Sequence, residues 1–123
     1  MQISEAESVV MEVLWRTHPL AAEDVVAALG DAQQWQEATI KTLLNRLLNK
    51  GAIAAAKDGR RYLYSPVLQR EDWVHGESEG LLQRLFDGRV APLVAHFSEH
   101  RKLSKTDIAD LRKLIEELDD EHR

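Results

Sequence analysis

The chain has 123 residues, of which 44% are apolar and 30% charged, with a formal net charge of −5 and no cysteine. Its length allows one domain or a small domain with an appendage, and this composition excludes a disordered chain, disulfides, thiolate metal sites and cysteine nucleophiles. No apolar run reaches the roughly 18 residues of a membrane span, and the acidic start shows no signal peptide, so we expect a cytoplasmic protein without membrane insertion.

Apolar residues at helical spacing predict six helices, which cover about residues 4–17, 22–29, 38–50, 69–87, 89–100 and 104–121. Ser4 and Glu7 fit a capping box at the start of the first helix, and the last begins at Ser104, with Asp107 three positions on. Gly30 is expected to close the second helix. The polar connection that follows is then longer than a minimal helix-turn-helix turn.

A hairpin is predicted after the third helix. Residues 53–57 and 60–64 are β-prone runs separated by Asp58-Gly59, which is typical of a two-residue type I′ turn. That register pairs Lys57 with Arg60, so two cations face each other at the tip and a nearby phosphate would offset their repulsion. It also turns four residues of the strands toward the helices: Ile53, Ala55, Tyr62 and Tyr64.

Positive charge is concentrated in the third helix and this hairpin. Residues 38–61 carry a net charge of +5, whereas the whole chain has −5. A solvated basic face on an ordinary helical domain is the simpler interpretation. The order of elements favours a winged helix-turn-helix that binds DNA, because a helix, a turn and a helix with a polar face are followed at once by a basic hairpin. We therefore predict a mainly α fold with a small β wing, in which residues 1–67 form the DNA-binding domain.

Arg46 is the best candidate to read a base, since a guanidinium can bond to guanine at two atoms. Asn45 suits adenine, Thr42 a thymine methyl group, and the lysines and wing cations suit phosphates. The full set of predicted contacts to double-stranded DNA is Thr39, Lys41, Thr42, Asn45, Arg46, Asn49, Lys50, Lys57, Arg60 and Arg61.

Residues 68–123 are expected to form a helical dimerisation domain. The winged helix is complete at Pro66, so three further amphipathic helices have little to pack against within one chain, and a homodimer would supply the missing partner. The last helix shows coiled-coil-like spacing. The predicted dimer contacts are Leu93, Phe97, Ile108, Leu111, Ile115 and Leu118.

No signature of an enzyme is present, because the chain has neither a glycine-rich phosphate loop nor a nucleophile motif. His96 and His100 are spaced as metal ligands on a helix can be, but no third ligand of known spacing follows. We therefore predict no catalysis, no metal and no cofactor.

Several motifs, in order and at matching spacing, make the chain resemble the penicillinase-repressor and methicillin-resistance-repressor family (BlaI/MecI/CopY) over nearly its full length. They are SEAESVVMEVLW, TIKTLLNRLLNKGAI with DGRRYLYSP, and LLQRLFDGRVAPLVAHF with LSKTDIADLRKLIEEL. The resemblance implies a homodimeric transcriptional repressor that binds a palindromic operator through its winged helices. It also implies regulation of β-lactamase or antibiotic resistance, through a membrane sensor peptidase whose activation leads to cleavage of the repressor.

The family's cleaved bond joins Asn to Phe, and the resemblance places His96-Phe97 there, so the first residue differs. The copper-responsive branch uses C-terminal cysteines, which this chain lacks. An alternative to the repressor is a winged-helix module that binds another protein and no operator, since a fold does not fix a function.

Overall fold

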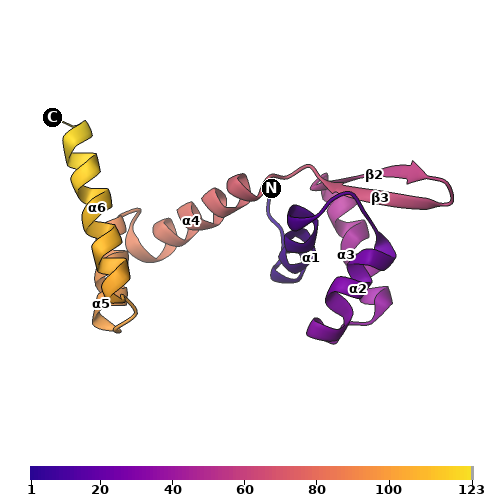
Figure 1. The fold of residues 1–123 in the computed structure, drawn as a ribbon, viewed down its shortest axis with the longest axis horizontal. Helices are drawn as coiled ribbons and strands as arrows, with labels where there is room; N and C mark the ends of the chain where they lie inside the picture. Colours follow the sequence, from indigo (N-terminus) through magenta and orange to yellow (C-terminus); the bar gives the residue numbers. More distant parts are fainter. Residues whose placement is uncertain (123) are drawn as a thin grey trace. The chain divides into compact units, whose positions relative to one another are not determined.

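The computed structural model describes residues 1–122, in which six helices and three strands follow one another (Figure 1). Their bounds are α1 Glu5–Arg16, β1 Leu20–Ala21, α2 Ala22–Gln33, α3 Glu37–Lys50, β2 Ile53–Asp58, β3 Arg61–Pro66, α4 Arg70–Phe86, α5 Val90–Glu99 and α6 Lys105–Glu121. The chain forms two compact units, Met1–Gly76 and the part from Glu77 onward. Within residues 1–122, no helix has both the length and the apolar character that a membrane span requires.

Helices α1, α2 and α3 of the first unit pack around one apolar core. The apolar stripe of each helix faces inward, and the buried members include Val10, Met11, Leu14, Val25, Leu29, Ile40, Leu44 and Leu47. Each such side chain contributes roughly 1.5–3 kcal/mol when it leaves water, so this core is the main source of the unit's stability. The predicted capping box is confirmed, since Ser4 Oγ accepts from the Glu7 amide and the Glu7 carboxylate accepts from the Ser4 amide.

Helix α2 is longer than predicted, and the expectation that Gly30 closes it was wrong. The helix runs through Gly30 to Gln33, and Gln34 adopts the left-handed conformation, at φ 57°, that ends it. A glycine inside a helix costs only about 1 kcal/mol relative to alanine, so Gly30 does not have to end α2. Only three residues then separate α2 from α3, which is the length of a helix-turn-helix turn.

The hairpin has a different register from the predicted one. Asp58 pairs with Arg61, so the two loop residues are Gly59 and Arg60 and the predicted pairing of Lys57 with Arg60 was wrong. Gly59 has φ 64°, and a glycine at the first loop position suits a type II′ turn. The observed register also places opposite charges across from each other, with 3.5 Å between the Asp58 carboxylate and the Arg61 guanidinium.

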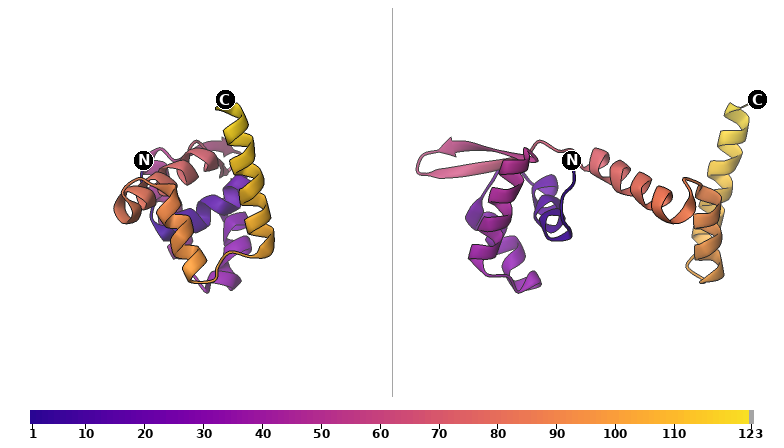
Figure 2. Two further views of the ribbon diagram at one scale, coloured as in Figure 1. Left: turned by 90° about the vertical axis from the view of Figure 1, so that its left-hand side faces the viewer. Right: turned by 180° about the vertical axis from the view of Figure 1, so that it is seen from behind.

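The four residues predicted to share a face still do so, because the observed partners differ from the predicted ones by two residues and side chains alternate with period two. The expectation that this whole face packs on the helices was wrong, since Ala55 and Tyr62 are exposed. Ile53, Ala55, Tyr62 and Tyr64 share one face, and among these four only Ile53 is buried. A third strand, β1, was not predicted; it pairs antiparallel with β3 and gives the sheet order β1-β3-β2. In Figure 2 the hairpin of β2 and β3 extends away from helices α1 to α3.

The first turns of α4 belong to the N-terminal unit. The rings of Trp15 and Trp73 lie 5.4 Å apart, and the Trp15 indole donates to the Leu68 carbonyl at 2.8 Å. Arg70 forms an ion pair with Glu12 at 3.1 Å. This unit therefore extends past Pro66, although which unit binds DNA and which one dimerises stays a prediction.

After the first turns of α4, helices α4, α5 and α6 carry apolar side chains that the single chain does not bury. Helix α4 continues through Gly76 and Gly80, and α6 begins with the capping box of Ser104 and Asp107. No residue of α4, α5 or α6 is buried among those that the structure describes. These three helices also make few contacts with one another.

Candidate nucleic-acid interface

Helix α3 presents a polar face to solvent on the N-terminal unit. Its buried stripe, Ile40, Leu43, Leu44 and Leu47, fixes the helix on the core and turns the residues between outward. The structure places six of the seven predicted contacts of this helix together on that face, all six of them exposed: Thr39, Lys41, Thr42, Asn45, Arg46 and Asn49. The second helix of a helix-turn-helix, exposed in this way, has the geometry that enters a major groove.

Arg46 lines a shallow hollow of about 270 Å³ on this face, together with Thr39 and Thr42. The Thr42 hydroxyl donates to the Ala38 carbonyl at 2.9 Å, which holds it against the helix. Among residues 1–122, no ion pair engages Arg46, whereas Lys41 pairs with Glu37 at 3.4 Å. The Arg46 guanidinium is therefore the cation of α3 that is most available to a ligand.

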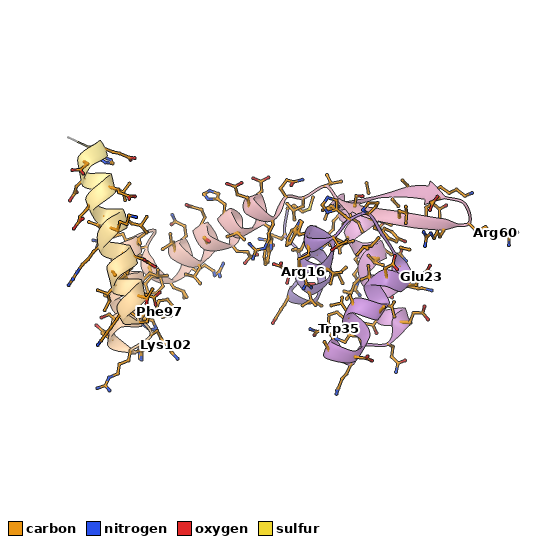
Figure 3. All side chains as sticks on the ribbon, viewed as in Figure 1. Arg16, Glu23, Trp35, Arg60, Phe97 and Lys102 are labelled. Carbon is orange, nitrogen blue, oxygen red and sulfur yellow. The ribbon has the colours of Figure 1, made fainter. Side chains whose placement is uncertain are left out.

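The hairpin adds a second group of cations. Arg60 lies in the loop at the hairpin tip (Figure 3), and Lys57 and Arg61 lie on the adjoining strands. Arg61 is held by two carboxylates, Asp58 at 3.5 Å and Glu23 of α2 at 3.6 Å. Exposed pairs of this kind contribute only about 0–1 kcal/mol, so a phosphate can compete for the guanidinium.

Lys50 differs from the other predicted contacts because its ammonium serves the fold. It donates to the Glu7 carboxylate at 2.6 Å and to the Gln2 carbonyl at 3.2 Å, which ties the end of α3 to the start of α1. Glu7 is only 2% exposed. Burial acts to raise the pKa of the Glu7 carboxyl, but hydrogen bonds from Lys50 and Ser4 together outweigh burial and hold that pKa below its usual value.

The predicted dimer contacts lie on α5 and α6. Leu93 and Leu111 are partly buried, and four others keep between 41% and 57% of their surface exposed: Phe97, Ile108, Ile115 and Leu118. Leu93 also lines an apolar hollow of about 370 Å³ between α4 and α5. The His96-Phe97 bond lies inside α5, as expected, and Figure 3 marks Phe97. The described residues contain no group of three or more His, Asp or Glu side chains placed to hold a metal ion.

Comparison with known proteins points to one family. A family model described as penicillinase repressor matches residues 3–117. The penicillinase repressor of Bacillus licheniformis is 34% identical over 116 residues, which cover 94% of this chain and 91% of that protein. The methicillin resistance regulatory protein MecI of Mammaliicoccus sciuri is 29% identical over 114 residues, or 93% of each chain.

A solved structure supports the assignment of the fold. The solution structure of monomeric Bacillus licheniformis BlaI in complex with the blaP half-operator has a TM-score of 0.53 and 38% identity to this chain. The likeness covers 58% of this chain and 88% of the BlaI chain. Together with the helices and the three-stranded sheet, it confirms the predicted winged helix.

Proposed function

Because the chain belongs to the penicillinase repressor family, we propose that it is a transcriptional repressor that binds double-stranded operator DNA. The observation that carries the proposal is the exposed polar face of α3, followed at once by the cationic hairpin. A repressor solved on its half-operator is similar to 58% of this chain, which supports the proposal.

Each group of side chains has a separate role in this proposal. The α3 face enters the major groove, where Arg46, Asn45 and Thr42 read base edges. Lys41 and the hairpin cations, above all Arg60, bind phosphates and set the orientation of the domain on the duplex. Lys50 stays outside the interface, because its ammonium is held by Glu7.

A homodimer would bind a palindromic operator with its two α3 helices about 34 Å apart, one turn of the duplex. The apolar side chains that α5 and α6 leave exposed support this assembly, since burial against a second copy removes them from water. Repression then follows from occlusion of the polymerase. Two tethered half-site contacts bind far more tightly than one.

Relief of repression is proposed to follow cleavage between His96 and Phe97 by a membrane sensor peptidase that responds to β-lactams or cell-wall stress. Cleavage would detach α6 from the winged helix, so the DNA-binding unit would lose its partner and its avidity. The bond lies within α5, and a protease needs extended chain, so this turn must open first. Mass spectrometry of the repressor from induced cells tests this step. An intact 14.0 kDa chain under full derepression would exclude it.

Fluorescence anisotropy tests operator binding directly. The purified chain is titrated into labelled DNA from upstream of its own gene and into a scrambled duplex of equal length. We expect much tighter binding to the upstream DNA at physiological salt. Equal, weak binding to both duplexes would favour a protein-binding module instead.

A further inference from the structure

Two of the chain's five histidines lie close together at the C-terminal end of α5, an arrangement that the repressor function does not use: His96 is in the helix, and His100 follows its last residue. The ring centroids of His96 and His100 lie 4.6 Å apart, and both side chains are exposed. The rings of His18 and His122, by contrast, each contact a backbone carbonyl four residues earlier, at 2.8 Å and 2.7 Å. Among the described residues, no hydrogen bond or ion pair engages the imidazole of His96 or His100.

The sequence spacing alone led to the prediction of no metal, but the placement of the two rings supports a weaker site with two protein ligands. We propose that His96 and His100 chelate one divalent transition-metal ion of the class that prefers imidazole, such as Zn²⁺, Ni²⁺ or Cu²⁺. A metal–nitrogen bond of about 2.1 Å places the ion about 3.2 Å from the ring centroid. When the nitrogen–metal–nitrogen angle is a right angle, as around square-planar or octahedral ions, the two ring centroids lie about 4.5 Å apart. At the tetrahedral angle the centroids lie about 5.2 Å apart. The observed 4.6 Å lies within this range, so the spacing of the two rings is compatible with one ion held by both.

The surroundings of His96 favour binding over free motion of the ring. Phe86 and Phe97 flank it, with ring centroids 6.1 Å and 5.4 Å away, so the ring has less rotameric freedom to lose when an ion binds. The chain supplies two ligands and water supplies the others, since the described residues place no third His, Asp or Glu beside the pair. The site is therefore reversible rather than structural.

An ion held by both rings joins the two ends of one helical turn, and the His96-Phe97 bond lies in that turn. The chelate exists only while the turn is helical, so the ion stabilises the closed form by mass action. It therefore opposes the local opening that a protease requires. This consequence rests on the proposed cleavage, whereas the site itself does not.

Isothermal titration of the full chain tests the site, with protein purified without a histidine tag and stripped of metal, and with Ni²⁺ or Zn²⁺ as the probe. We expect one ion per chain, and a loss of affinity of at least about tenfold in His100→Gln and in His96→Gln. His75→Gln is the matched control, since this histidine lies on α4, and its affinity should equal that of the wild type. Undiminished binding in both His96→Gln and His100→Gln, or one ion shared by two chains, would overturn the chelate.

Hydrogen exchange measures the consequence separately. Zn²⁺ should slow amide exchange at residues 96–100 in the wild type. The exchange rates of the same residues in His100→Gln should not change when Zn²⁺ is added. Circular dichroism and operator binding establish that the variant is folded. Exchange that stays fast in the zinc-bound wild type would refute the stabilised turn. Neither measurement uses the peptidase, so a failure of the proposed cleavage would leave both results interpretable.

Discussion

Arg46 is where the α3 interface can be tested at a single side chain. It lies exposed on the polar face without an ion-pair partner in the described residues, so its guanidinium can bond to a guanine. We expect Arg46→Ala to weaken operator binding by about 1–3 kcal/mol with little loss of stability. Arg16→Ala, an exposed arginine of α1, removes the same charge away from this face and is the control. An equal loss on operator and scrambled DNA would show that Arg46 contacts a phosphate.

The ion pair of Lys50 and Glu7 should matter for stability rather than for DNA binding. Lys50→Met keeps the apolar stem and leaves the buried Glu7 carboxylate without its cation. Because Lys50 is 39% exposed, we expect a loss of about 1–3 kcal/mol in the free energy of unfolding, less than for a fully buried pair. Lys41→Met, which removes an exposed pair with Glu37, should change stability by less than about 0.5 kcal/mol. Urea unfolding at pH 7 measures both.

The same pair gives the fold a dependence on pH. The pKa of Glu7 is lower in the folded chain than in the unfolded one, so its contribution is complete above the unfolded value of about 4.3. It is lost as the pH falls through the folded pKa. The wild type should therefore exceed Glu7→Gln in unfolding free energy at pH 7, and this difference should shrink in acid. A constant difference across that range would contradict the lowered pKa.

At the scale of elements, the hairpin cations should act on all DNA sequences alike. Arg60→Ala with Arg61→Ala should weaken binding to operator and scrambled DNA together and reduce the slope of log K against log salt by up to about 2. Arg60 lies in the loop, whereas Arg61 forms ion pairs with Asp58 and Glu23. Arg60→Ala alone should therefore cause the greater part of the loss in affinity and in salt slope. An unchanged slope in the double variant would mean that the hairpin stays off the DNA.

The sequence predicted those elements whose signal is local. Helix α3 was found within one residue of its ends because its apolar stripe repeats and Gly51 closes it at φ 78°. The end of α2 was predicted wrongly because a helix tolerates a glycine at a modest cost. The turn was predicted wrongly because Asp58-Gly59 and Gly59-Arg60 both suit a two-residue loop. The two residues of β1 are too few to show a period.

The candidate site, like the fold, was predictable only where its signal is local in the sequence. The exposed face of α3 follows from helical spacing, so its members could be named in advance. The capping box identified one role of Glu7, but its pairing with Lys50 joins positions 43 residues apart and leaves no local pattern. Partners of this kind depend on how α1 and α3 pack, which a sequence period does not specify.

For the whole molecule, the proposed homodimer depends on the apolar side chains of α5 and α6. Helix α6 exposes Ile108, Ile115 and Leu118 along one stripe, with Leu111 between them partly buried. Leu111→Asp with Leu118→Asp should place unpaired charge in the shared core, where its burial is very costly. We expect monomers or unfolded chain by sedimentation, because obligate dimers often have no stable separated form.

The control for this variant lies on the same helix. Arg112→Asp with Lys113→Asp introduces the same side chains at exposed positions outside the apolar stripe and should leave the dimer intact. A monomer that keeps its winged helix should bind a half-site as a single domain but bind the full operator far more weakly than the dimer does, since it loses the second tethered contact. An intact dimer in the variant Leu111→Asp with Leu118→Asp would show that α6 is not part of the dimer interface. Cleavage at His96-Phe97 could then no longer act by detaching the dimer contacts of that helix.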